Sequence, residues 1–157
     1  MKTRNMDPKI EHGLKLCRRG RWDEGVTCLK DILETRGADA EYPAAFYSYL
    51  GYGLARKENR IRDALKLCKK ACEIEFLEPI NFLNMARVQL LAGNRRAVVK
   101  NLNRGLRLNP NHAGLLKFKE MFGVRRSPVL PFLSRNSLVN RVFGVIRHRL
   151  AGGVKIG

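Results

Sequence analysis

Cysteine and histidine are among the side chains of this chain that could bind a metal ion or act as nucleophiles. A structural zinc site needs four such ligands at short, recognisable spacings. The sequence has four cysteines but no Cys-x-x-Cys pair, and its histidines do not cluster with them. Cys68 and Cys72 are four residues apart, about one helical turn, inside apolar-periodic segments. We therefore expect the cysteines to pack in a core as small hydrophobes, and we predict no metal or other cofactor.

Motifs of catalysis are absent from the sequence as well. It contains no glycine-rich phosphate loop after a strand, no His-Glu-x-x-His and no Gly-x-Ser-x-Gly. The acidic pairs Asp23–Glu24 and Glu73 with Glu75 are explained more simply as helix-start or solvent-exposed charges than as acid–base pairs. We predict that the protein is not an enzyme, although a fold does not by itself fix function.

The charge is large and uneven. The chain has 31 Lys and Arg against 14 Asp and Glu, a net charge of +17. Residues 1–78 hold 16 basic and 13 acidic side chains, whereas residues 79–157 hold 15 basic and 1 acidic. A positive field attracts phosphate backbones, anionic lipid surfaces or acidic protein segments. Simple solubility is the alternative explanation.

The length and composition are those of one globular domain or a short repeat array. The chain has 157 residues, of which 45% are hydrophobic and 29% charged. No run reaches the roughly 18 apolar residues of a membrane-spanning helix. Residues 1–8 carry charges with no apolar stretch behind them, which is not the pattern of a secretory signal. We expect a cytoplasmic protein.

A pattern of small and large apolar residues recurs along the chain. The small residue that opens each copy is Gly13, Gly51 or Ala86, so the steps are 38 and 35 residues. Residues 47–54 show the pattern clearly as Tyr-x-x-Leu-Gly-x-x-Leu, and the last copy closes with Leu-Asn-Pro-Asn at 108–111. Two antiparallel helices approach closely where small residues lie at their crossing. This predicts three close pairs, namely Gly13 with Gly25, Gly51 with Ala64, and Ala86 with Val98.

This spacing, and the order of small and large apolar residues within it, resemble the tetratricopeptide repeat (TPR), a 34-residue helix–turn–helix unit. The resemblance covers roughly residues 7–122. It implies an all-α fold, an α-solenoid of about three TPR-like helix hairpins at about 7–37, 42–76 and 79–110 with a capping helix at 111–122. One hairpin cannot bury its apolar face alone, so the hairpins must stack. The expected repeat domain is 1–123, with helices at 8–19, 22–36, 42–57, 60–75, 79–92, 95–107 and 111–122.

Residues 124–157 form a basic C-terminal extension of different character. Prolines interrupt an apolar strip at 128–133, and an amphipathic helix is predicted at about 136–150. This extension either folds back over the open end of the last repeat or docks on an anionic membrane surface, a partner groove or nucleic acid. The arginines that would make such contacts are Arg125, Arg126, Arg135, Arg141, Arg147 and Arg149.

In TPR proteins the first helix of each hairpin lines a concave groove that binds extended peptides or helices. By matched position, the groove residues implied here are Ile10, Leu14, Tyr52, Arg56, Leu83, Arg87 and Lys117. An apolar strip with a basic flank would suit another protein that carries acidic and aliphatic residues. The resemblance thus implies a protein–protein interaction adaptor or scaffold.

Chaperone adaptors of the TPR family grip a terminal carboxylate with Lys and Asn at five groove positions. The matching positions of this chain are Ile10, Leu14, Tyr49, Ile80 and Asn84. Because Asn84 alone among them offers an amide, we do not expect capture of a chaperone tail. The alternative function is binding of nucleic acid or an anionic membrane surface through the basic C-terminal half. A homodimer formed through exposed solenoid ends is also left open.

Overall fold

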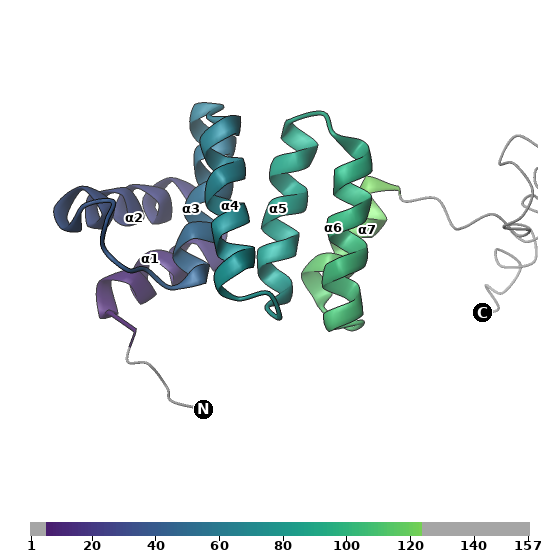
Figure 1. Ribbon diagram of the computed structural model, residues 1–157, viewed down its shortest axis with the longest axis horizontal. Coiled ribbons are helices and arrows are strands. Elements are labelled where there is room, and N and C mark those ends of the chain that lie inside the picture. Colours follow the sequence, from purple (N-terminus) through teal and green to yellow (C-terminus); the bar gives the residue numbers. More distant parts are fainter. Residues whose placement is uncertain (1–5, 124–157) are drawn as a thin grey trace, which may run out of the picture. The chain divides into compact units, whose positions relative to one another are not determined.

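The computed structural model describes residues 6–123, and these fold into seven α-helices with no β-strand among them (Figure 1). The helices are α1 (Pro8–Arg18), α2 (Trp22–Arg36), α3 (Ala44–Glu58), α4 (Ile61–Ile74), α5 (Pro79–Leu91), α6 (Arg95–Leu108) and α7 (Ala113–Phe122). All seven helices predicted within this range are present. The helix predicted at 136–150 lies outside the described residues.

Side chains at the helix starts explain most of the boundaries. The Asp7 carboxylate accepts a hydrogen bond from the backbone N–H of Lys9 at 2.7 Å, and Pro8 occupies the first turn of α1. Glu78 and Pro79 repeat this arrangement at α5. Helix α7 begins two residues later than predicted, and there the His112 imidazole accepts a hydrogen bond from the Leu115 N–H at 3.2 Å.

The helices stack as consecutive hairpins, α1 with α2, α3 with α4 and α5 with α6, and α7 packs on the last pair. Neighbouring hairpins touch in part through their first helices, because α1 contacts α3, α3 contacts α5 and α5 contacts α7. The second helices α2, α4 and α6 contact the first helix of the next hairpin and do not approach one another closely. Two rows of helices result, which we call the inner row (α1, α3, α5, α7) and the outer row (α2, α4, α6).

Small residues lie where the two helices cross in the first and second hairpins, as predicted, and the pair Ala86 with Val98 stays a prediction. A methyl group placed on Gly25 would lie 2.9 Å from the Gly13 carbonyl oxygen, and one on Gly51 would lie 3.0 Å from the Ala64 carbonyl oxygen. Gly53 has the same role between hairpins, since a methyl group there would lie 2.1 Å from Cγ2 of Val26 in α2. These distances leave no room for a side chain, so the small residues set how closely the helices pack.

The four cysteines are unpaired thiols, and burial is the main cause that raises the pKa of each. It raises the pKa of Cys17 and of Cys72 to about 11, and it raises that of fully buried Cys68 further. Since the thiolate is the reactive form, we expect slow labelling by Ellman's reagent at about pH 8, with Cys68 modified last. Labelling in denaturant gives the control rate. Native Cys68 reacting as fast as half-buried Cys28 would contradict this packing.

Candidate functional site

Aromatic and arginine side chains of four helices, α1, α2, α3 and α5, come together in the stack of hairpins. We call this group the aromatic–arginine cluster. Its members are Arg18 (α1), Trp22 (α2), Ser48, Tyr49 and Tyr52 (α3), and Asn84 and Arg87 (α5). The cluster thus joins all three hairpins through contacts between side chains far apart in the sequence.

Trp22 forms the aromatic centre of the cluster. Its ring stacks on Tyr49 with 5.9 Å between ring centroids and an interplanar angle of 23°. It also meets Tyr52 edge-on, with centroids 4.8 Å apart and an angle of 86°. Both are favoured aromatic geometries, and Tyr49 and Tyr52 lie one turn apart on α3. The first residue of α2 therefore fixes the position of two tyrosines on the inner row.

Arg87 is held by a chain of polar contacts. Its Nη1 donates a hydrogen bond to Oδ1 of Asn84 at 3.0 Å, and Nδ2 of Asn84 donates to Oγ of Ser48 at 3.0 Å. Ser48 and Asn84 are fully buried, so their orientations are fixed by the surrounding core. The guanidinium carbon of Arg87 lies 5.1 Å from the centre of the Tyr52 ring, in cation–π geometry.

Arg87 is also a half-buried positive charge. Burial is the main cause that lowers the pKa of its guanidinium, and the nearby charge of Arg56 acts in the same direction. An arginine stays protonated in spite of such a shift. Within residues 6–123, none of the ion pairs found involves Arg87, whereas carboxylates of the first two hairpins do pair with Lys30 and Lys57. A half-buried cation of this kind attracts an external anion.

The first hairpin adds a second arginine to the cluster. The guanidinium carbon of Arg18 lies 5.8 Å from the centre of the Tyr49 ring. Burial raises the pKa of Tyr49, and Arg18 opposes that shift, so the hydroxyl group is neutral at pH 7. The cluster therefore offers arginine N–H donors beside aromatic faces, which is suitable for a carboxylate next to an apolar side chain.

Three of the predicted groove residues meet at this cluster. Tyr52 and Arg87 are members, and the exposed Arg56 lies close enough to Arg87 to influence its pKa. Lys117 is exposed on α7 and is not a member of the cluster. A role of these four residues in binding a partner stays a prediction.

The other three groove residues require a correction. Ile10, Leu14 and Leu83 are buried with at most 2% of their surface exposed, so a partner on the surface does not reach them. Ile10 and Leu14 belong to a core cluster that is filled by large aromatic residues of α3, among them Phe46. Leu83 is covered by α7, since a methyl group on Gly114 would lie 2.8 Å from its Cδ2.

Sequence reasoning missed Arg18 and Trp22 as members of the site. The groove positions of TPR proteins lie on the first helix of each hairpin, whereas Trp22 begins a second helix. A signal was available, because Trp22 is the single tryptophan of the chain and lies four residues after Arg18. The six predicted tail arginines lie beyond residue 123 and outside the described residues.

The described part of the chain offers neither a metal site nor a membrane-spanning helix. Between residues 6 and 123, no three His, Cys, Asp or Glu side chains are grouped so that they could hold a metal ion. No helix in that range has the length and apolar character needed to cross a membrane.

Comparison with known proteins places the fold. No protein-family model and no curated protein matches the sequence. Solved structures do match. The NMR structure of the first TPR domain of the human RPAP3 protein aligns with a TM-score of 0.57 and 17% identity, covering 73% of this chain and 87% of that one. The first TPR of Spaghetti (RPAP3) bound to the HSP90 peptide SRMEEVD aligns with a TM-score of 0.55, also at 17% identity and with the same coverage.

The described residues therefore form an all-α solenoid of helical hairpins. More specifically, this is a TPR-like fold, as the spacing of small residues predicted. The agreement lies in the three-dimensional arrangement, since few residues are identical.

Proposed function

We propose that this protein is an interaction adaptor, not an enzyme, and that the aromatic–arginine cluster binds an acidic segment of another protein. The observation that carries the proposal is the half-buried guanidinium of Arg87, which has buried Asn84 and Ser48 to orient it and no carboxylate partner among residues 6–123. Charge-assisted hydrogen bonds from such a group to a carboxylate are among the stronger polar interactions in proteins.

The surroundings of Arg87 favour a segment that combines carboxylates with aliphatic side chains. Arg18 and Arg56 add further positive charge, and the half-buried rings of Trp22 and Tyr52 offer apolar surface. The TPR domain of Spaghetti binds a peptide whose letters include two Glu and one Asp, which is consistent with an acidic ligand. Of the five positions used by chaperone adaptors, three hold the aliphatic residues Ile10, Leu14 and Ile80 here, so we do not expect capture of a chaperone tail.

Replacing Arg87 with methionine tests the proposal. We expect Arg87→Met to weaken binding of a labelled peptide of alternating Glu and Leu by roughly 10- to 100-fold, the equivalent of a lost charge-assisted hydrogen bond. Arg56→Glu should weaken it further. Fluorescence anisotropy measures the dissociation constants, and circular dichroism checks that the variants remain folded.

Arg62→Met is the matched control, because Arg62 is an exposed arginine on α4 outside the cluster. It should bind the peptide as the unmodified chain does. The peptide SRMEEVD serves as a second probe and should bind more weakly than the Glu–Leu peptide. Equal binding by the Arg56→Glu, Arg87→Met double variant would move the site away from the cluster.

Three further expectations stay predictions. They are nucleic-acid or anionic-membrane binding through the basic C-terminal half, pairing of two copies, and a cytoplasmic location. The division into a repeat domain at 1–123 and a basic extension at 124–157 is retained as part of the proposal.

A further inference from the structure

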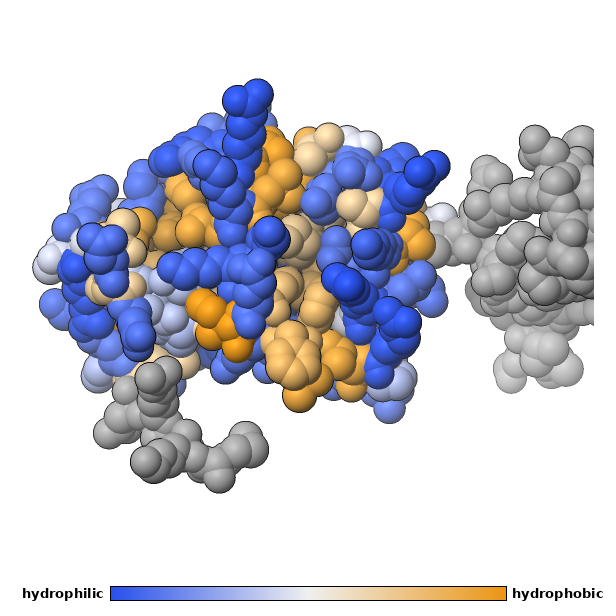
Figure 2. All heavy atoms as spheres, viewed as in Figure 1, coloured by the Kyte–Doolittle hydropathy of each residue, from blue (hydrophilic) through white to orange (hydrophobic). Residues whose placement is uncertain are grey.

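A second surface feature lies between two helices of the outer row and shares no residue with the aromatic–arginine cluster. It is a hollow of about 480 Å³ bounded by α4 and α6 with α5 beneath, which we call the α4–α6 groove. Its apolar lining consists of Cys72, Phe76, Phe82, Met85 and Leu108. Figure 2 shows an apolar band over the central helices with hydrophilic side chains on both sides.

Two of the five apolar residues that line this groove are exposed, whereas Phe82 at its base is buried. Phe76 has 65% of its surface exposed, and Leu77 beside it in the α4–α5 turn has 66% exposed. Leu77 is a neighbour of the lining, and the second exposed lining residue is Leu108 at the end of α6, with 37% of its surface exposed. Single exposed apolar residues are common on soluble proteins, but adjoining ones that line a hollow are typical of a binding surface.

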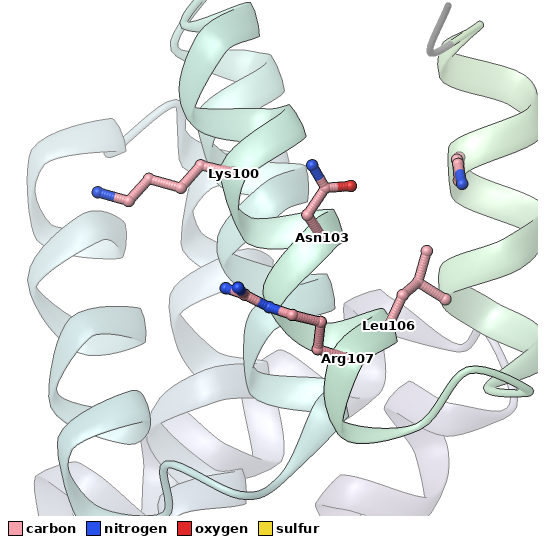
Figure 3. Close-up of a pocket in the computed structure, with 5 residues that line it drawn as sticks. Lys100, Asn103, Leu106 and Arg107 are labelled. Carbon is pink, nitrogen blue, oxygen red and sulfur yellow. The ribbon is translucent and has the colours of Figure 1, made fainter. Parts of the chain in front are cut away.

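Positive charge surrounds the groove. Lys69, Arg104 and Arg107 line it together with the apolar residues, and Glu73 is its one acidic lining residue. Glu73 pairs with Lys69 at 3.6 Å, whereas none of the ion pairs found within residues 6–123 involves Arg104 or Arg107. Helix α6 carries five basic and no acidic residues. Figure 3 shows that Lys100 and Arg107 project from the same side of this helix.

We propose that the α4–α6 groove docks an amphipathic segment of another protein, with large apolar side chains in the hollow and carboxylates against Arg104 and Arg107. This is a second interaction surface, separate from the proposed function of the cluster, since it shares no residue with it. An adaptor with two such surfaces holds two partners at once.

The charge around the groove distinguishes between occupants. A two-fold dimer through this surface would place the same patch against itself, so the arginines of both copies would repel each other. A nucleic-acid backbone would satisfy the arginines but offers no apolar groups for Phe76 and Leu77. An acidic amphipathic segment satisfies both parts of the lining, as in helix-in-groove recognition.

The test uses a labelled synthetic peptide of eighteen residues with Leu at helical i, i+3, i+4 and i+7 positions and Glu elsewhere, titrated with the full chain. We expect Phe76→Ser to weaken binding at least roughly tenfold, as for a central apolar anchor. The matched control is Met121→Ser, because Met121 is exposed to a similar extent, 68% against 65%. It should leave the dissociation constant unchanged. Arg104→Gln should also weaken binding, and the difference from the unmodified chain should become smaller as salt is added.

Several results would overturn the proposal. Equal loss in Phe76→Ser and Met121→Ser would show that the groove is not the site. A peptide with Ser in place of Leu that binds equally well, or full competition by duplex DNA, would indicate a polyanion site. A dimer in sedimentation that Phe76→Ser dissociates would indicate a second copy. All of these titrations are repeated in an Arg87→Met background, which removes the contribution of the cluster to binding a Glu- and Leu-rich peptide, so that a loss caused by Phe76→Ser in this background belongs to the groove alone.

Discussion

Replacing Leu14 with alanine is expected to lower the free energy of unfolding by about 2–5 kcal/mol, the usual cost of a cavity in a close-packed core. Leu14 is fully buried within the core cluster formed by α1, α2 and α3. The same cluster contains Ile10 and Phe46, and shortening Leu14 leaves a cavity in its packing. Chemical denaturation, with the slope as a check on two-state behaviour, measures the change.

The result decides between a core and a groove role for this position. A groove residue replaced with alanine would weaken peptide binding and leave stability nearly unchanged. The control is Leu116→Ala, because Leu116 is 44% exposed on α7, and its cost should be far smaller. Similar unfolding midpoints for the Leu14 and Leu116 variants would contradict the burial of α1 against α3.

Gly51→Leu should have an effect of similar size for the opposite reason, which is overpacking. Even a methyl group at Gly51 would lie 2.9 Å from Sγ of Cys68 and 3.0 Å from the backbone oxygen of Ala64. The backbone of α4 cannot move without opening the hairpin. Leucine favours a helix over glycine by about 1 kcal/mol, but overpacking costs about 1–3 kcal/mol or more, so the larger side chain should destabilise the protein.

Thermal unfolding of Gly51→Leu and Gly51→Ala measures this effect. The control is Ala113→Leu, which adds a similar side chain at an exposed position of α7. Its melting temperature should stay close to that of the unmodified chain. An unchanged melting temperature for Gly51→Leu would show that α3 and α4 do not cross at this residue.

The fold was predictable because its main determinants are local. Each hairpin needs a small residue where its two helices cross, and Gly51 is an example. Each helix also needs a residue that starts it, as Asp7 and Glu78 do, and both kinds of residue are visible in the sequence. Tyr52, Arg56 and Arg87 could be assigned to one surface for the same reason, since Tyr52 and Arg87 lie at matching positions of successive first helices and Arg56 lies one turn after Tyr52. Because the repeat has a nearly constant length, residues one repeat apart in the sequence are expected on the same face of the stack.

The burial of Ile10 and Leu14 was not predictable in this way. It depends on which side chains fill the space between hairpins, here the stacked rings of Tyr42 and Phe46 with centroids 4.2 Å apart. The support of Arg87 is equally non-local, because Asn84 is held by Ser48, 36 residues earlier. Such contacts depend on side-chain volumes and rotamers that a repeat period does not specify.

The basic character of α6 has a consequence for how partners arrive. The first two hairpins balance their charges, with pairs such as Lys30–Glu58 and Lys57–Asp23, whereas residues 79–123 hold eight basic side chains and one acidic. The stack therefore has a permanent electric dipole moment along its length. An approaching polyanion would be rotated and steered toward the α5–α7 end before contact, so raising the ionic strength should slow capture far more than release.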